Sequence, residues 1–119
     1  MMPDPAAVGT VVVGEWRRKP KPLFPEKDYR EIVEIVRSGV AFMLSRHRGT
    51  EAVAKTAEIM KCIHGMLGVR HPPNPIDLAI LAFTLRLMYG DCFEVNGSTW
   101  YLAKIERRSH GYYYYFRRL

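Results

Sequence analysis

The dipeptide Asn96-Gly97 constrains the fold of this chain more than any other short segment. It lies between "DCFEV" and "STWYLAKIERR", two stretches rich in β-branched and aromatic residues. Asn-Gly favours a two-residue turn between antiparallel strands, because both residues tolerate a positive φ. With such a turn, Val95 opposes Ser98 and Phe93 opposes Trp100. The sequence therefore predicts a β-hairpin in the last third of the chain.

A second hairpin is expected to follow the first. The segment "SHG", Ser109 to Gly111, separates the strand that contains Trp100 from "YYYYFRR". A three-residue turn at this point pairs Arg107 with Tyr113 and, further along, Ile105 with Tyr115. Residues 91–118 are thus predicted to form a three-stranded antiparallel meander.

Three helices are expected before the meander. Apolar spacing predicts a first helix over Glu26–Arg46, and Thr50 supplies an N-cap for a second helix that ends at Gly68. Asn74 and Pro75 supply the N-cap and first position of a third helix, Pro75–Tyr89. Because the third helix is apolar nearly all round, we expect it to be central and covered on most sides.

An additional strand near the N-terminus completes the expected fold. Thr10–Trp16, "TVVVGEW", is β-branched and short, and the proline-rich "RRKPKPLFP" after it favours an extended path. Residues 1–8 are expected to be loose. We predict one α+β domain over residues 1–119, with three main helices around a largely apolar central helix. The helices pack on an antiparallel sheet of about four strands, the N-terminal strand plus the C-terminal meander.

The net charge of +6 is concentrated at the two ends of the sequence. Residues 15–22 contain four bases and one acid, and residues 101–119 contain five bases and one acid. The long middle, residues 23–90, has nine bases against seven acids. Such a distribution favours a basic patch over a generally basic surface. No apolar run is long enough to cross a membrane and no basic leader precedes one, so we expect a cytoplasmic protein without a membrane partner.

The sequence contains little that indicates catalysis. Its four histidines are scattered in no metal-binding spacing, and it has neither a glycine-rich phosphate loop nor a nucleophile motif. Cys62 and Cys92 are better explained as two thiols in a reducing compartment than as a disulfide, although a disulfide stays open. We therefore expect no metal, no cofactor and no enzymatic activity.

Basic residues interleaved with aromatic residues form the remaining signal. Surfaces of this kind bind single-stranded nucleic acid, because cations follow the backbone while bases stack on the rings. The predicted phosphate-binding residues are Arg17, Arg18, Lys19, Lys21, Lys104, Arg107, Arg108 and Arg117. The predicted stacking surfaces are Trp16, Tyr101, Tyr113 and Tyr115, with Trp100 as a further candidate.

Strand parity indicates which of these side chains share a face. One face of the meander is expected to carry Tyr101, Ala103, Ile105, Arg107, Tyr113, Tyr115 and Arg117. The other face is expected to pack on the third helix through Phe93, Trp100, Leu102, Tyr112, Tyr114 and Phe116. The alternative is that both faces are covered and that the tyrosines are present only as good strand formers.

Taken together, "EWRRKPKP", "WYLAKIERRSHGYYYYFRR" and a nearly all-apolar helix beside a four-stranded sheet resemble the ThermoDBP family. These are single-stranded DNA-binding proteins of thermophilic archaea and their shorter relatives. The resemblance implies helices that embrace an antiparallel sheet, and a hydrophobic and basic cleft that binds single strands with little sequence preference. The absence of glutamine and the presence of only two asparagines fit a thermophilic source. The leucine zipper of the longer members is missing here, which leaves a homo-oligomer open.

Three functional hypotheses follow. The first is a non-catalytic protein that binds single-stranded DNA or RNA, since rings and cations do not distinguish the two. The second is a winged-helix regulator that binds duplex DNA; the apolar character of Pro75–Tyr89 opposes it, because a recognition helix exposes polar side chains to the bases. The third is a protein-interaction or assembly module whose tyrosines and arginines form a protein interface.

Overall fold

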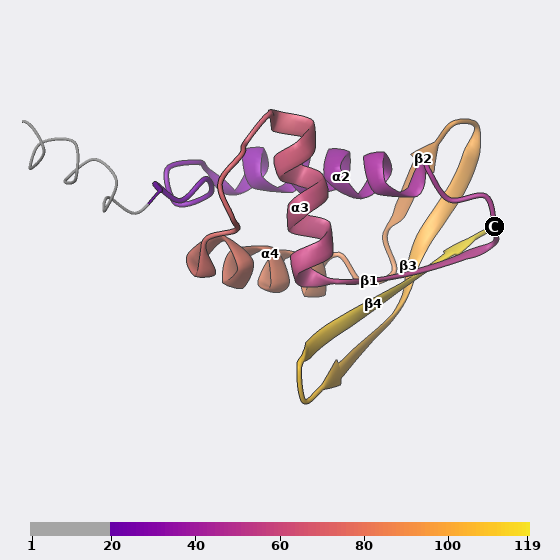
Figure 1. Cartoon of the computed structure of the whole chain (residues 1–119). Helices are drawn as coiled ribbons and strands as arrows, with labels where there is room; N and C mark the ends of the chain where they lie inside the picture. Colours follow the sequence, from indigo (N-terminus) through magenta and orange to yellow (C-terminus); the bar gives the residue numbers. More distant parts are fainter. Residues whose placement is uncertain (1–19) are drawn as a thin grey trace, which may run out of the picture.

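The computed structural model describes residues 20–119, and these residues form three helices and one four-stranded antiparallel sheet. The elements in chain order are α2 (Tyr29–Leu44), β1 (Glu51–Lys55), α3 (Thr56–Leu67), α4 (Pro75–Leu87), β2 (Cys92–Val95), β3 (Ser98–Arg108) and β4 (Gly111–Arg118). The strands lie in the order β1-β4-β3-β2. The helices gather at one side of the sheet, and the β3–β4 hairpin extends beyond α4 (Figure 1). The predicted α+β class is confirmed; the strand expected at Thr10–Trp16 lies outside the described residues.

Helix α2 begins and ends close to the predicted limits. Asp28 is its N-cap, and the Asp28 carboxylate accepts a hydrogen bond from the backbone N–H of Glu31 at 2.8 Å. The Glu31 carboxylate accepts one in return from the backbone N–H of Asp28 at 3.2 Å, which completes a capping box. The apolar side chains of its stripe are buried against the rest of the core, among them Val36 and Val40.

Strand β1 corrects the prediction that a helix begins directly after Thr50. Ala52 and Ala54 are buried while their neighbours along the strand are exposed, which is the two-residue period of a half-buried strand. The strand pairs antiparallel with β4, with Ala52 opposite Phe116 and Ala54 opposite Tyr114. Small side chains at these positions leave room for the two large rings of β4. Helix α3 therefore starts only at Thr56.

Helix α4 starts as predicted but is not covered on most sides. Asn74 caps it by accepting a hydrogen bond from the backbone N–H of Ile76 at 2.8 Å. Leu81 and Leu85 are fully buried, whereas Phe83 and Leu87 on the other side of the helix are each 55% exposed. The prediction of a central third helix is therefore wrong, because the helix lies at the margin of the helical layer and only one of its apolar sides faces the core.

Helices α2 and α3 make the most extensive contact within the helical layer. Gly39 of α2 lies so near to α3 that an added Cβ would come within 2.3 Å of Cγ1 of Ile63. The buried side chains around this point include Val36, Val40 and Ile59. Glycine at this position lets two helices approach at backbone distance, so the α2–α3 pair forms the centre that we had assigned to α4.

The sheet packs one face on this helical layer. Its buried residues on that face are Ala52, Ala54, Phe93, Val95, Trp100, Leu102, Tyr114 and Phe116. The Tyr114 hydroxyl lies 3.0 Å from Oγ1 of Thr56, at the start of α3, so this buried polar atom has a partner. Within residues 20–119, no helix has the length and apolar character needed to cross a membrane.

Candidate nucleic-acid interface

The sheet face that points away from the helices is the candidate site, and we call it the open face. Its residues on β1, β3 and β4 include Glu51, Val53, Lys55, Tyr101, Lys104, Glu106, Arg108, Tyr113, Tyr115 and Arg117. They come from three neighbouring strands, because β4 lies between β1 and β3. Alternation along each strand separates this set from the buried rings of the opposite face. The predicted division of the tyrosines is confirmed: Tyr114 is fully buried, and Tyr113 and Tyr115 lie on the open face.

A β-bulge in β3 decides which β3 residues reach the open face. The register shifts between Leu102 and Lys104, so Ala103 is the extra residue. Beyond the bulge, Lys104 pairs with Tyr115. The meander prediction had placed Ile105 opposite Tyr115; instead Ile105 packs against the core.

The turn between β3 and β4 is also shorter than predicted. Arg108 pairs with Gly111, so only two residues, Ser109 and His110, connect the strands. Glu106, and not Arg107, consequently pairs with Tyr113, and Arg107 pairs with Tyr112 on the other side of the sheet. The predicted position of Arg107 on the open face is therefore wrong.

Two cations cover the ring of Tyr113. The Lys55 ammonium lies 5.4 Å and the Arg108 guanidinium 4.4 Å from the centre of the ring. Both distances are in the range of cation–π contacts. Lys55 comes from β1 and Arg108 from β3, so the pairing of three strands builds this arrangement. A nucleobase that stacks on Tyr113 must displace one of these two cations.

Tyr115 is held in a hydrogen-bonded group with an acid and a base. Its hydroxyl donates to Oε1 of Glu106 at 2.7 Å and accepts from Nη2 of Arg108 at 3.0 Å. The hydrogen bond from Tyr115 is the largest cause that lowers the pKa of Glu106, followed by the one from Arg108. The hydrogen bond to Glu106 in turn raises the pKa of the Tyr115 hydroxyl. The ring orientation of Tyr115 is thus set before any ligand arrives.

A hollow of about 400 Å³ lies on the open face beside the bulge. Tyr101 and Tyr115 line it with aromatic surface, and Lys104 and Arg117 line it with positive charge. The Lys104 ammonium lies 5.0 Å from the centre of the Tyr115 ring. Planar rings and cations therefore border one concave surface, an arrangement that suits a planar base attached to a phosphate.

Acids moderate the positive charge of the open face. Arg117 lies 3.4 Å from Glu51, but both side chains are more than half exposed, so the pair is weak. Arg108 contacts Glu106 at 2.8 Å. Within residues 20–119, Lys55 and Lys104 take part in no ion pair. These two lysines are the cations of the open face that an incoming phosphate meets without displacing an acid.

Among the described residues, three predicted site residues in all do not join the open face. Trp100 is only 1% exposed, so its prediction as a stacking surface is wrong; the Arg118 guanidinium covers its ring at 4.8 Å. Arg107 lies on the opposite side, 6.0 Å from the Tyr112 ring. Lys21 is exposed and pairs with Glu26, before α2 and away from the sheet. The predicted residues that lie outside the described part of the chain are Trp16, Arg17, Arg18 and Lys19.

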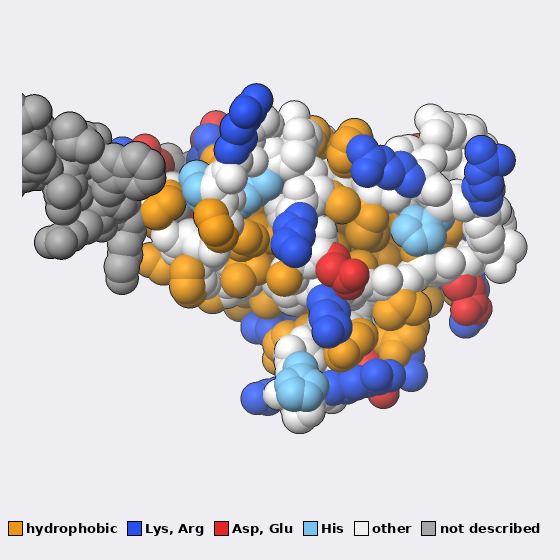
Figure 2. Space-filling model, in the orientation of Figure 1, with side chains coloured by type: hydrophobic (Ala, Val, Ile, Leu, Met, Phe, Trp, Pro, Cys, Tyr) orange, Lys and Arg blue, Asp and Glu red, His pale blue; other side chains and the backbone are white. Residues whose placement is uncertain are grey.

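Two basic residues near the rings were not predicted. Lys55 was missed because its segment was assigned to a helix, and alternation in "EAVAK" was the only signal that could have found it. Arg86 of α4 lies 4.7 Å from the Tyr112 ring, on the same side as Arg107. No sequence pattern predicts this contact between a helix and a strand. Lys and Arg side chains are seen to gather at the far end of the β3–β4 hairpin (Figure 2).

The described residues offer no alternative site for metal chemistry. Within residues 20–119, no three His, Cys, Asp or Glu side chains are grouped so that they could hold a metal ion. Cys62 is half-buried and Cys92 exposed, and the two are not joined to each other. Burial raises the pKa of the Cys62 thiol, which opposes the thiolate form that a nucleophile needs.

Comparisons with known proteins add no relative. No protein-family model, no curated protein and no solved structure matches this chain. The resemblance to the ThermoDBP family therefore stays a prediction.

Proposed function

We propose that this protein binds single-stranded nucleic acid, DNA or RNA, through the open face, with low sequence specificity and without catalysis. One observation carries the proposal: Tyr101 and Tyr115 line the same hollow as Lys104 and Arg117. A cytoplasmic location and a relation to the ThermoDBP family belong to this proposal, and the basic, aromatic open face supports the relation.

In the proposed mode of binding, the hollow accepts a base and the lysines hold the backbone. A base lying between Tyr101 and Tyr115 would gain about 1–3 kcal/mol from stacking. Lys104, at the rim of the hollow, would contact the adjacent phosphate. Lys55 and Arg108 flank the next ring, Tyr113, so a second nucleotide could follow the line of β4. Two acids limit the affinity, because Glu106 pairs with Arg108 and Glu51 with Arg117, and each competes with the nucleic-acid phosphates for its arginine.

Fluorescence anisotropy with labelled oligo-dT and oligo-U tests the proposal. We expect binding that weakens as salt rises, because released counterions drive it. Tyr101→Ala should weaken binding about tenfold, the equivalent of one lost stacking contact. Lys104→Gln should reduce the salt slope by about 0.7, the value for one phosphate contact on a single strand. Arg30→Gln, on the exposed side of α2, is the matched control and should change neither quantity.

Two results would refute the proposal. One is the absence of binding to either single strand at low salt. The other is preference for a duplex in direct competition with its own strands, which would instead favour the β3–β4 hairpin as a groove-probing wing.

A second candidate function is assembly through α4. Ile76, Phe83 and Leu87 are each more than half exposed, and together with Ile80 they recur at spacings of four, three and four residues. This spacing is typical of the seam between two paired helices. A second copy of the chain is the simplest partner, because a two-fold axis lets one face cover itself. Light scattering coupled to gel filtration tests it: Phe83→Glu should convert a dimer to a monomer, and a monomer at all concentrations would exclude this role.

A further inference from the structure

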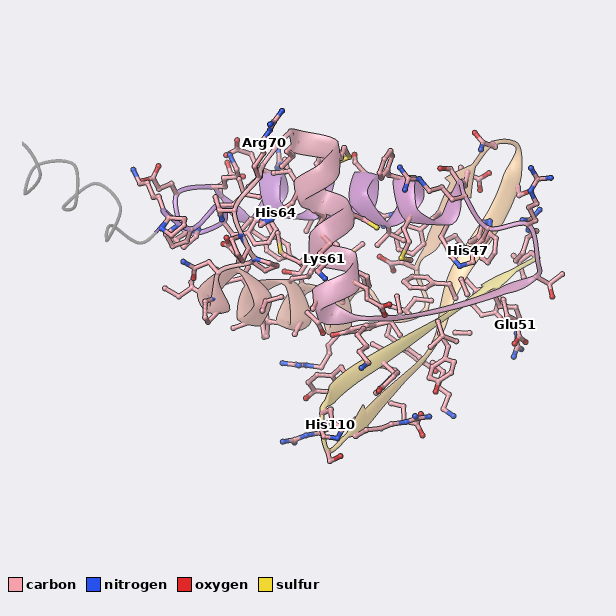
Figure 3. The ribbon with its side chains drawn as sticks, viewed as in Figure 1. His47, Glu51, Lys61, His64, Arg70 and His110 are labelled. Atoms are coloured by element: carbon pink, nitrogen blue, oxygen red, sulfur yellow. The ribbon has the colours of Figure 1, made fainter. Side chains whose placement is uncertain are left out.

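A second hollow lies between the end of α3 and the loop that leads to α4. It measures about 410 Å³, and its lining includes Lys61, His64, Val69, Arg70, His71 and Pro73. We call it the histidine pocket. It belongs to the helical layer and not to the open face, as the positions of Lys61, His64 and Arg70 show (Figure 3). The histidine pocket is therefore a separate site from the open face.

His64 is a buried side chain with one ring nitrogen that has no hydrogen-bond partner in the described part of the chain. The residue is 5% exposed, and within residues 20–119 its Nε2 has no hydrogen-bond partner. Buried polar atoms are nearly always paired, so an unpaired one calls for a ligand or another explanation. The His71 ring lies edge-on to it, with 5.2 Å between the ring centres. His71 is on the loop, so movement of this ring gives access to Nε2 of His64.

A hydrogen bond of His71 determines which of its two ring nitrogens is free to bind a ligand. Its Nδ1 lies 2.8 Å from the carbonyl oxygen of Pro72, so Nδ1 carries a proton and donates it. Nε2 is then left for a ligand and becomes a second donor when the ring is protonated. Each of the two imidazoles that line the pocket thus has an Nε2 without a hydrogen-bond partner among the described residues.

The charge of the pocket favours an anion. Its titratable lining residues are all basic: Lys61 and Arg70 are exposed, His71 is half-buried and His64 is buried. Lys61 lies in the middle of α3 and Arg70 on the loop that follows the helix (Figure 3). Neither side chain pairs with an acid among the described residues. The buried acid of α4, Asp77, already accepts hydrogen bonds from the backbone N–H groups of residues 23 and 24, at 2.7 and 2.9 Å.

Burial is the largest cause that lowers the pKa of His64, followed by repulsion from His71; the His71 carbonyl and Asp77 act in the opposite direction. Without a ligand, the pocket therefore resists protonation of His64. A bound anion would have the opposite effect, because its negative charge stabilises the protonated, positively charged imidazole. A divalent metal ion fits less well, since two flanking cations would repel it and no third protein ligand lies within the described residues.

We propose that the histidine pocket binds a phosphate monoester, with His64 and His71 donating hydrogen bonds to the phosphate oxygens and Lys61 and Arg70 closing over it. The hollow is larger than a phosphate group alone, and its apolar lining beside the bases, Val69 with two prolines, can cover the organic group attached to the phosphate. A free nucleotide and the 5′-phosphate of a nucleic-acid strand share this chemistry.

Histidine NMR of the full chain tests the proposal, because two of the four histidines lie in the pocket and two lie elsewhere. The ring signals would be followed over the pH range in which histidine titrates, with AMP, with inorganic phosphate, or with chloride at equal ionic strength. We expect AMP and phosphate to raise the titration midpoints of His64 and His71 by about 0.5 pH unit, a threefold linkage. His47 and His110 should not move.

Variants and strand ends complete the test. The double substitution Lys61→Gln with Arg70→Gln should weaken AMP binding about tenfold and leave the fold intact, because both side chains are in solvent. His110→Asn is the matched control. Oligo-dT with a 5′-phosphate is compared with the same strand carrying a 5′-hydroxyl. If only the phosphorylated strand shifts the NMR signals of His64, the phosphate that the pocket binds belongs to a strand end. Unmoved His64 and His71 at tens of millimolar phosphate, or a response to micromolar Zn²⁺ in place of phosphate, would overturn the proposal.

Discussion

The close approach of α2 and α3 at Gly39 provides a quantitative test of the fold. In Gly39→Ala the new Cβ would lie 2.3 Å from Cγ1 of Ile63. Ile63 is fully buried, so its side chain cannot move away without displacing its neighbours. Overpacking of this kind costs about 1–3 kcal/mol, while the higher helix propensity of alanine offsets about 1 kcal/mol. We expect the free energy of unfolding to fall by up to about 2 kcal/mol.

A second substitution at the same contact separates overpacking from any other cause. Ile63→Ala alone should cost about 2–5 kcal/mol, because it leaves a cavity. In the double variant the clashing Cγ1 is gone, and Cβ of residue 39 would be 3.5 Å from Cβ of residue 63, an ordinary contact. The new methyl group then fills part of the cavity. The cost of the double variant should therefore be less than the sum of the single costs by at least about 1 kcal/mol.

Urea unfolding followed by far-UV circular dichroism measures all four members of this cycle. Gly65→Ala in α3 is the control, because nothing lies within 4 Å of the added Cβ; it should stabilise the protein by up to about 1 kcal/mol. If Gly39→Ala proves stabilising, or if the two single costs simply add, the close packing of α2 on α3 is not as described.

Three further outcomes follow from single contacts. The pKa of His64 is lowered in the folded state, so the unfolded chain binds more protons below about pH 6.5 and the free energy of unfolding should fall with acidification. Urea unfolding at about pH 8 and about pH 5.5 measures this fall, which should be smaller in His64→Asn than in the unsubstituted protein. Leu85→Ala should cost about 2–5 kcal/mol, but Phe83→Ala less than about 1 kcal/mol, in the same assay; equal costs would mean that α4 is covered on both sides. Tyr115→Phe should raise the pKa of Glu106, seen by carboxyl NMR, yet keep oligo-dT affinity within about twofold, whereas Tyr115→Ala should lose about tenfold; equal losses would mean that the hydroxyl, and not the ring, binds the strand.

The candidate site could be predicted in part. Parity correctly assigned Tyr113 and Tyr115 to one face and Tyr114 to the other, because alternation holds along any regular strand. Parity failed for Ile105 and Arg107, because the bulge at Ala103 and the two-residue turn each shift the register of β3 against β4 by one residue. Neither change has a local signal in the sequence, since the bulge depends on how β3 fits against β4.

Local chemistry determined the elements whose causes lie within a few residues. The Asn74 cap and the Asn96-Gly97 turn are both present where the sequence indicated them. Each depends on one side chain and the backbone next to it, so no distant part of the chain is needed to form it. The α+β class followed from the order of these elements.

Only the tertiary structure decided which segment became the fourth strand of the described sheet, and which helix became central. Residues 51–55 form β1 because β4 offers them an edge and two large rings that Ala52 and Ala54 can accommodate. Helix α4 is apolar on nearly all sides, yet Gly39 lets α2 and α3 approach each other and leaves α4 at the margin. Both outcomes depend on contacts between residues far apart in sequence, and the hydrophobic effect that drives them has no preferred direction. Composition can therefore indicate that a segment is to be buried, but packing decides which other segment it is buried against.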